Sequence, residues 1–195
     1  MSENDITLHD ALKSSYNDKK ARQKLSNAGY KYDSMLSNHN QQVWHNPNTN
    51  KLLYNVAGTH NLKDVGTDIY LALGGLKKTN RYKEADRKLE EARKKYNASN
   101  VTVTAHSLGA SIASGISKKD DKVYALDAGY TIGQKTRDRD GNHHHYRSQG
   151  DLVSALGANA TNMTTLKQNN LGVLNYLNPL SSHDINNIKK ENIII

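Results

Sequence analysis

The sequence predicts an α/β fold in which a mostly parallel central sheet is flanked by helices. Short β-branched segments alternate along the chain with longer segments of helical periodicity, which is typical of parallel strands joined by right-handed connections. At 101–114 a β-branched run changes at Ser107 into a small-residue helical pattern, which indicates a strand, a sharp turn and a helix. A chain of 195 residues is expected to form one domain, spanning residues 1–195.

The composition predicts a thin hydrophobic core. Only 35% of the residues are hydrophobic, and with no Phe and one Trp the interior must be built from aliphatic residues and the 11 Tyr. The single tryptophan, Trp44, is expected to be a half-buried strand residue. Because cysteine is absent, a disulfide framework, a cysteine nucleophile and thiolate metal sites are excluded.

The N-terminal third predicts a helix followed by a meander. Residues 6–25 carry apolar side chains at helical spacing, so we expect an amphipathic helix that covers one edge of the sheet. Residues 29–36 and 41–45 are candidate strands, and the turn cluster at 46–50 returns the chain into a strand at 51–57.

The rest of the chain predicts crossover helices and further strands. Two helices are expected before the strand that ends at Ser107, and a buried strand that closes at Asp127 is expected after the helix that follows this serine. In order, the expected elements are helices at 65–76 and 81–96, strands at 123–127 and 144–147, a core segment at 171–180 and a last helix at 184–190.

Ser107 is a candidate nucleophile because it lies in the sharp turn between strand and helix. Such a turn lifts the hydroxyl above the end of the sheet and aims the N-terminus of the helix at it. The turn needs small neighbours, which Ala105 and Gly109 provide. This pattern is the nucleophile elbow of the α/β-hydrolase fold, so we expect a compact fold of that kind.

The same architecture predicts donors for a negatively charged oxygen. A serine nucleophile needs an adjacent base and hydrogen-bond donors for the oxyanion of the tetrahedral intermediate. The strand at 52–57 ends in Gly58 and Thr59, where this fold supplies one backbone donor. We therefore expect the oxyanion hole to be formed by the backbone N–H groups of Thr59 and Leu108.

These motifs resemble those of the class 3 lipase family, the fungal-lipase-like triacylglycerol hydrolases. The segment Thr-Ala-His-Ser-Leu-Gly-Ala at 104–110 is similar to the family's Gly-His-Ser-Leu-Gly-Gly elbow, and Val-Ala-Gly-Thr at 56–59 is similar to its Arg-Gly-Thr oxyanion segment. Three alanines, Ala57, Ala105 and Ala110, depart from the commonest family residues. The resemblance covers about residues 25–190.

The resemblance also implies the other two members of a catalytic triad. Asp151, after Tyr146-Arg147, lies in a segment similar to the one that holds the family's acid, and His183 lies in a segment similar to the one that holds its histidine. Ser107, Asp151 and His183 then follow the chain order of the α/β-hydrolase fold. Asp127, at the end of the strand after the elbow helix, is the rival candidate for the acid.

The resemblance implies a serine-dependent carboxylic ester hydrolase, a lipase or phospholipase acting on acylglycerols or phospholipids. No metal or organic cofactor is required for that chemistry. Two alternatives stay open on the same fold. One is a non-catalytic scaffold or interaction protein, and the other is a thioesterase or acyltransferase.

The remaining histidines are assigned no catalytic role. Consecutive residues of a strand point to opposite faces, so the run His143-His-His145 does not converge on one ion. His106 precedes the serine and is expected to pack or hydrogen-bond beneath the elbow, and His60 is expected to be a loop residue.

A formal net charge of +8 favours anionic partners such as a membrane surface. The densest basic stretch, 77–95, is interleaved with acidic residues and is typical of a solvated helix face, and no motif supports nucleic-acid binding. The N-terminal residues lack the features of a signal peptide and no segment is long enough for a membrane span, so we expect cytosolic synthesis. The Lys, Asn and Ile bias is typical of AT-rich genomes, including viral ones, which raises a viral particle as a second location.

Overall fold

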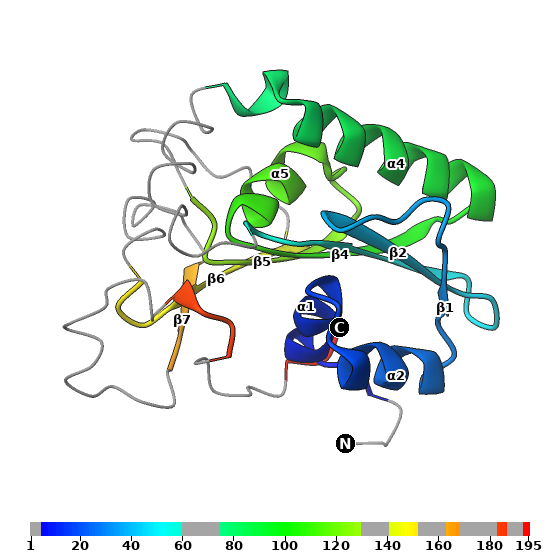
Figure 1. Cartoon of the computed structure of the whole chain (residues 1–195), viewed down its shortest axis with the longest axis horizontal. Coiled ribbons are helices and arrows are strands. Elements are labelled where there is room, and N and C mark those ends of the chain that lie inside the picture. Colours follow the sequence, from blue (N-terminus) through cyan, green and yellow to red (C-terminus); the bar gives the residue numbers. More distant parts are fainter. Residues whose placement is uncertain (1–4, 60–74, 130–140, 152–162, 168–182, 187–192) are drawn as a thin grey trace.

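A seven-stranded sheet forms the centre of the molecule in a computed structural model that describes residues 5–59, 75–129, 141–151, 163–167, 183–186 and 193–195 (Figure 1). The strands, which lie side by side in sequence order, are β1 (Lys31–Tyr32), β2 (Gln41–Asn46), β3 (Lys51–Val56), β4 (Asn100–His106), β5 (Lys122–Leu126), β6 (His143–Ser148) and β7 (Met163–Leu166). β1 to β3 form an antiparallel meander, and β3 to β7 all run parallel. The predicted α/β fold with a mostly parallel sheet is therefore confirmed.

Helices cover both faces of this sheet. The described helices are α1 (Leu8–Ser15), α2 (Lys19–Asn27), the short 3₁₀ helix η1 (Leu76–Lys78), α4 (Asn80–Tyr96) and α5 (Leu108–Ile116). Figure 1 shows α4 and α5 on one face and α1 and α2 on the other. Right-handed connections between neighbouring parallel strands put successive crossover helices on the same face, which accounts for the shared side of α4 and α5.

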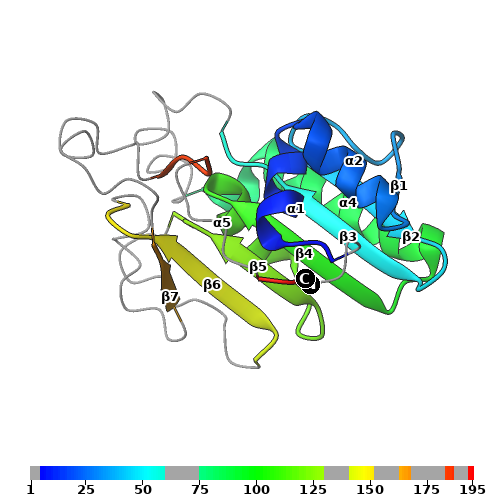
Figure 2. The ribbon, with the colours of Figure 1, turned by 90° about the horizontal axis from the view of Figure 1, so that it is seen from below.

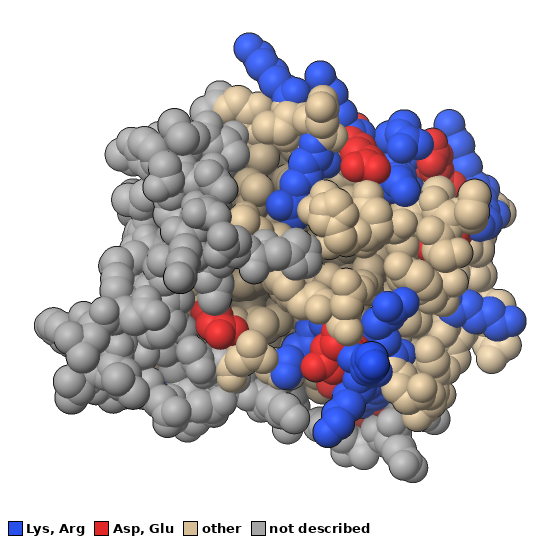
Figure 3. Space-filling model, viewed as in Figure 1, with Lys and Arg blue, Asp and Glu red and all other residues tan. Residues whose placement is uncertain are grey.

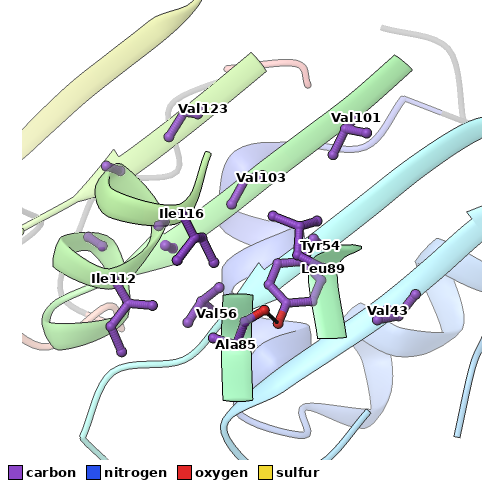
Figure 4. Close-up of a cluster of buried hydrophobic side chains, with 14 of the residues drawn as sticks. Val43, Tyr54, Val56, Ala85, Leu89, Val101, Val103, Ile112, Ile116 and Val123 are labelled. Carbon is purple, nitrogen blue, oxygen red and sulfur yellow. Dashed lines mark hydrogen bonds between the residues drawn. The ribbon is translucent and has the colours of Figure 1, made fainter. Parts of the chain in front are cut away.

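The larger hydrophobic core lies between the sheet and the pair α4 and α5 (Figure 4). It is mainly aliphatic, with Val103 from β4, Ile112 from α5 and Leu89 from α4 among its members. Tyr54 brings an aromatic ring into this core, and its hydroxyl donates to the carbonyl of Ala85 at 2.9 Å. Burial of this polar hydroxyl is thereby compensated.

The opposite face of the sheet is also closed. Trp44 is only 2% exposed and packs with Ala11 and Leu25 of the N-terminal helices. The expectation of a half-buried Trp44 was thus wrong, because α1 and α2 lie over the face of the sheet and not along its edge.

The predicted helix at 6–25 is two helices. α1 ends before Asn17, whose φ of 64° is incompatible with continued right-handed helix. Asp18 then starts α2, because its side chain accepts the backbone N–H of Ala21 at 2.9 Å. The break gives the chain a sharp corner at the end of α1.

Other predictions differ in extent. The strand expected at 29–36 is reduced to β1, because the Asp33 carboxylate accepts the backbone N–H groups of Met35 and Leu36 and forms a turn. β7 was not predicted. The helix expected at 65–76 lies outside the described residues except for its last two positions, and the segment at 171–180 and most of the helix expected at 184–190 lie outside them too.

The C-terminal residues 193–195 lie beside the start of α1 (Figure 2). Thr7 and Ile194 form an antiparallel bridge, and the backbone N–H of Leu8 donates to the carbonyl of Ile193 at 2.8 Å. Among the described helices, none combines the length and the apolar character that crossing a bilayer requires.

The contact between α5 and the end of β3 generates a prediction about stability. A Cβ added at Gly109 would come within 3 Å of the carbonyl oxygens of Val56 and Ala57, and backbone atoms cannot rotate away as a side chain can. We expect Gly109→Ala to lower the free energy of unfolding by about 1–3 kcal/mol, measured by urea denaturation.

Gly75→Ala is the matched control. A Cβ at Gly75 meets no atom within 4 Å, so this variant should stay within about 1 kcal/mol of the parent protein. Equal stability of the two variants would show that Gly109 is not required by close packing.

Candidate active site

Ser107 lies in a strained turn between β4 and α5. Its φ of 57° and ψ of −128° are unusual for a residue with a side chain, and such strain is found mainly where function requires it. Its backbone N–H donates to the carbonyl of Leu126 at 2.9 Å, so the end of β5 holds the turn in position. The predicted order of strand, sharp turn and helix is confirmed.

An imidazole and a carboxylate lie buried beside this turn. His183 Nδ1 lies 2.9 Å from Asp151 Oδ1, and both residues are almost fully buried. A carboxylate accepts hydrogen bonds, so Nδ1 carries the hydrogen and Nε2 of the neutral ring is an acceptor. The backbone N–H of Asp151 donates to the carbonyl of Ser148 at 3.1 Å, which ties the carboxylate to the end of β6.

At the serine and the imidazole, two buried polar atoms have no hydrogen-bond partner among the described residues. They are Oγ of Ser107 and Nε2 of His183. Buried polar atoms are usually paired, and an unpaired hydroxyl and an unpaired imidazole nitrogen in one site call for a functional explanation.

The surroundings favour protonation of His183. Burial opposes the charged form, but the hydrogen bond to Asp151 and the negative charges of Asp151 and Asp127 raise the pKa of His183 above its ordinary value. The imidazole is therefore suited to take up a proton and hold it as an imidazolium.

Asp127, the rival for the acid, has different partners. It follows β5 in a left-handed conformation with a φ of 51°. Its two carboxylate oxygens accept hydrogen bonds from the backbone N–H and the hydroxyl of Ser148, each at 2.6 Å. Burial and the nearby charge of Asp151 raise the pKa of Asp127 to about 7. Asp127 thus anchors the end of β6, whereas Asp151 receives the imidazole N–H.

The segment Ala57–Thr59, here called the oxyanion loop, lies directly against Ser107. A Cβ added at Gly58 would be 2.8 Å from the Cβ of Ser107, so a glycine is needed for this approach. Thr59 follows, and its Oγ1 is buried without a partner among the described residues. Leu108 is the first residue of α5, a position whose backbone N–H has no partner within the helix.

Arg81 of α4 fixes the carbonyl side of the oxyanion loop. Its guanidinium donates to the carbonyl of Ala57 and, at 3.0 Å, to that of Gly58. Burial lowers the pKa of Arg81, but a guanidinium stays charged at any physiological pH. The sequence did not indicate this contact between Arg81 and the oxyanion loop, because Arg81 is one of many basic residues on a charged helix.

His106 and Tyr16 lie beneath the elbow. His106 Nε2 lies 3.0 Å from the carbonyl of His183, and its Nδ1 lies 2.7 Å from Oη of Tyr16. The expectation that His106 hydrogen-bonds beneath the elbow is confirmed. Tyr16 was assigned only to the apolar face of a helix, and its role as a hydrogen-bond partner was missed.

A pocket of about 330 Å³ opens beside the oxyanion loop, on the side of α1. It extends from Tyr16 and the corner at Asn17 to Thr59 and the residues that follow His183. Most of its described lining residues have polar side chains, and the lining consists of Lys13, Tyr16, Asn17, Asp18, Thr59, His106, Asp184, Ile185 and Asn186.

One group of potential metal ligands occurs among the described residues. Donor atoms of His106, Asp127 and His183 lie within 4.8 Å of one another. They do not fit a metal, because His106 Nε2 carries the hydrogen that the carbonyl of His183 accepts, and both oxygens of Asp127 accept hydrogen bonds from Ser148.

The histidine run of β6 behaves as its strand position predicts. His143 is buried and its Nε2 lies 3.1 Å from the carbonyl of Lys118, whereas His144 is half-buried and stacks on Tyr124 with ring centroids 5.0 Å apart. His60 lies outside the described residues.

Known structures share this architecture. A scan against protein-family models finds no match, and a search of curated proteins finds no sequence relative. The chain is similar to the crystal structure of the Lip2 lipase from Yarrowia lipolytica, with 16% identity, 74% of this chain and 68% of that chain covered, and a TM-score of 0.50. It is also similar to a structure described as a fungal lipase, with 13% identity, 97% and 83% coverage, and a TM-score of 0.47. At such low identity the Lip2 similarity shows the fold alone, and the chain therefore has an α/β-hydrolase fold.

Proposed function

We propose that this protein is a serine-dependent carboxylic ester hydrolase, a lipase or phospholipase that acts on acylglycerols or phospholipids. The observation that carries this proposal is the buried His183–Asp151 pair. Nε2 of His183 and the hydroxyl of Ser107 share one site, and neither has a hydrogen-bond partner in the part of the chain that the structure describes. The strained backbone at Ser107 supports it further, because such strain is typical of a nucleophile elbow.

The proposed reaction begins when Oγ of Ser107 attacks the ester carbonyl carbon and His183 Nε2 takes the hydroxyl proton. Asp151 orients the ring and stabilises the imidazolium. The carbonyl oxygen becomes an oxyanion that accepts hydrogen bonds from the backbone N–H groups of Leu108 and Thr59. His183 then gives its proton to the departing alkoxide oxygen. The leaving group departs as an alcohol, and the acyl group stays bound to Oγ of Ser107 as an acyl-enzyme.

The second half of the reaction repeats these roles with water. His183 takes a proton from the water that attacks the acyl carbon, and it returns that proton to Oγ of Ser107 as the acid leaves. An acyltransferase or thioesterase would share the acyl-enzyme and differ in the acceptor or in the acyl donor. The polar side chains among the residues that line the pocket beside Thr59 support an ester with a polar alcohol part, such as a glycerol derivative.

The nucleophile assignment predicts the effect of Ser107→Ala. Hydrolysis of a short-chain p-nitrophenyl ester should fall by at least about a thousandfold, because only the oxyanion donors and substrate binding remain. Labelling by a fluorophosphonate probe should disappear as well. Ser114 lies in α5, the helix that follows Ser107, and its hydroxyl donates to the Ala110 carbonyl, so Ser114→Ala should keep both hydrolysis and labelling. Full activity of Ser107→Ala, or no labelling of the parent protein, would overturn the proposal.

The assignment of Asp151 as the acid of the triad is tested by replacing each of the two candidate aspartates with asparagine. Asp151→Asn should reduce turnover by up to about ten-thousandfold, because the imidazole loses the acceptor that fixes its tautomer. Asp127→Asn should retain far more activity. Both variants are assayed on the same p-nitrophenyl ester as the parent protein, after a thermal melt shows that each is folded. If the folded Asp127→Asn variant were the inactive one, Asp127 would be the acid.

We also propose that positive charge brings the protein to anionic lipid surfaces. Lys and Arg side chains gather along α4 (Figure 3), where many pair with acidic neighbours, as Arg87 does with Glu91. In η1 and the first turn of α4, Lys77, Lys78 and Lys83 are exposed and form no ion pair with any described residue. They lie near the oxyanion loop, because Arg81 of the same segment contacts it.

Binding to phosphatidylglycerol vesicles should therefore weaken when Lys77, Lys78 and Lys83 are replaced by Gln, and also at 1 M salt, where the Debye length is about 3 Å. The matched control replaces three exposed lysines at the other end of the sheet, Lys51, Lys94 and Lys122. Vesicle sedimentation measures the binding of the parent protein and of both triple variants at low and at high salt. Equal losses in the two triple variants would show that only total charge matters, and binding insensitive to salt would contradict the proposal.

A further inference from the structure

An unbroken run of hydrogen bonds joins the oxyanion loop to the loop that carries His183. The backbone N–H of Gly58 lies 2.8 Å from Oη of Tyr16. The same hydroxyl lies 2.7 Å from His106 Nδ1, and His106 Nε2 lies 3.0 Å from the backbone carbonyl of His183. Two side chains thus connect two backbone segments on either side of the nucleophile.

Every hydrogen in this run can be assigned. The carbonyl of His183 can only accept, so His106 Nε2 carries a hydrogen. Burial and the neighbouring charge of His183 lower the pKa of His106 to about 3, so its ring is neutral and Nδ1 is a bare acceptor. The hydroxyl of Tyr16 must then donate to Nδ1, and it accepts the N–H of Gly58. All hydrogen bonds point the same way, from Gly58 to His183.

The Gly58 end of the run is tied to the rest of the fold on two sides. Tyr16 is the C-terminal cap of α1, and α1 is fastened to the sheet because Asn55 of β3 donates to the hydroxyl of Ser14 at 2.7 Å. Arg81 holds the carbonyl of Gly58 from the other face. The Gly58 peptide is therefore fixed at its N–H and at its C=O, and the next N–H in the chain is that of Thr59.

We propose that Tyr16 and His106 are positioning residues that set the distance between the oxyanion donors and the base. This inference rests on the proposed function of Ser107, Thr59 and His183. Both side chains also line the pocket beside Thr59, but neither is required to touch the reacting atoms or to exchange a proton. His106 joins the two segments because it accepts a hydrogen bond at Nδ1 and donates one at Nε2. A displacement of catalytic groups by about 1 Å costs up to about a hundredfold in rate, which sets the size of the effect.

The two atoms that His106 uses suggest a stringent test. A glutamine also offers one acceptor, its Oε1, and one donor, its Nε2, but it cannot titrate. His106→Leu should lower kcat for the p-nitrophenyl ester by about ten- to a hundredfold with KM changed by less than about twofold, because the loss falls on the transition state. His106→Gln should recover most of that loss. Tyr16→Phe should resemble His106→Leu, and the double variant Tyr16→Phe with His106→Leu should be little worse than either alone.

The pH profile separates positioning from proton transfer. Because His106 stays neutral, the pH dependence of kcat/KM for His106→Gln should match that of the parent protein. A lost or shifted ionisation in this variant would mean that His106 itself titrates in the reaction. The proposal would also be overturned if the kcat of His106→Gln did not exceed that of His106→Leu in variants with matched thermal melts.

A readout independent of activity separates this inference from the proposed function. In the ¹⁵N NMR spectrum of the full chain, His106 should be neutral with its hydrogen on Nε2 from pH 5 to pH 9. Tyr16→Phe should shift its Nδ1 resonance. A hydrogen on Nδ1, or titration in this range, contradicts the hydrogen-bond run whatever the activity. A parent protein with the expected spectrum but without esterase activity or probe labelling would instead refute the proposed function.

Discussion

The close packing of three backbone segments at the end of the sheet is the constraint on which the candidate site depends. α5 approaches the end of β3 so closely that only glycine fits at Gly109, and the oxyanion loop approaches Ser107 so closely that only glycine fits at Gly58. The end of β5 completes the arrangement through the hydrogen bond between Leu126 and the Ser107 N–H. Because the segments cannot separate without opening this contact, the nucleophile and its oxyanion donors are held together by the backbone itself.

Beside this contact, the fold buries four titratable side chains, and few of them carry a charge. The four are His106, Asp127, Asp151 and His183. Burial of an unpaired charge costs several kcal/mol or more, so neighbouring buried groups must be neutral or paired. His106, with a pKa of about 3, stays uncharged, and the pKa of about 7 at Asp127 keeps that carboxyl largely protonated below neutral pH. Among these four residues, Asp151 and His183 are the pair whose side chains are joined by a hydrogen bond. The imidazole of His183, which would change its charge in the reaction, therefore lies beside a neutral His106 and has an oriented acceptor in Asp151.

The parts of the fold that follow from local pattern were predictable, and the parts that depend on tertiary contact were not. The elbow was visible because the change from a β-branched run to small residues at Ser107 is a local signal. The end of α1 was not visible in the sequence, because Tyr16 continues the spacing of apolar residues that is typical of a helix. The helix nevertheless ends there, since Asn17 adopts a left-handed conformation and Asp18 starts the next helix. The pairing of Asp151 with His183 came from a resemblance in motif order, since residues 32 positions apart carry no local signal of contact. The run through Tyr16 and His106 joins residues 90 positions apart and could not be read from spacing at all.

Arg81 illustrates how tertiary structure can supply what a motif lacks. The class 3 lipase segment that this chain resembles carries an arginine where this chain has Ala57. Ala57 is fully buried, and its carbonyl lies against Gly109, so the alanine suits a position closed by backbone on one side. A guanidinium nevertheless reaches the same loop, because the right-handed crossover from β3 brings the start of α4 back over the end of that strand. The cation and the loop that it holds thus come from separate elements, and only the path of the chain between β3 and β4 brings them together.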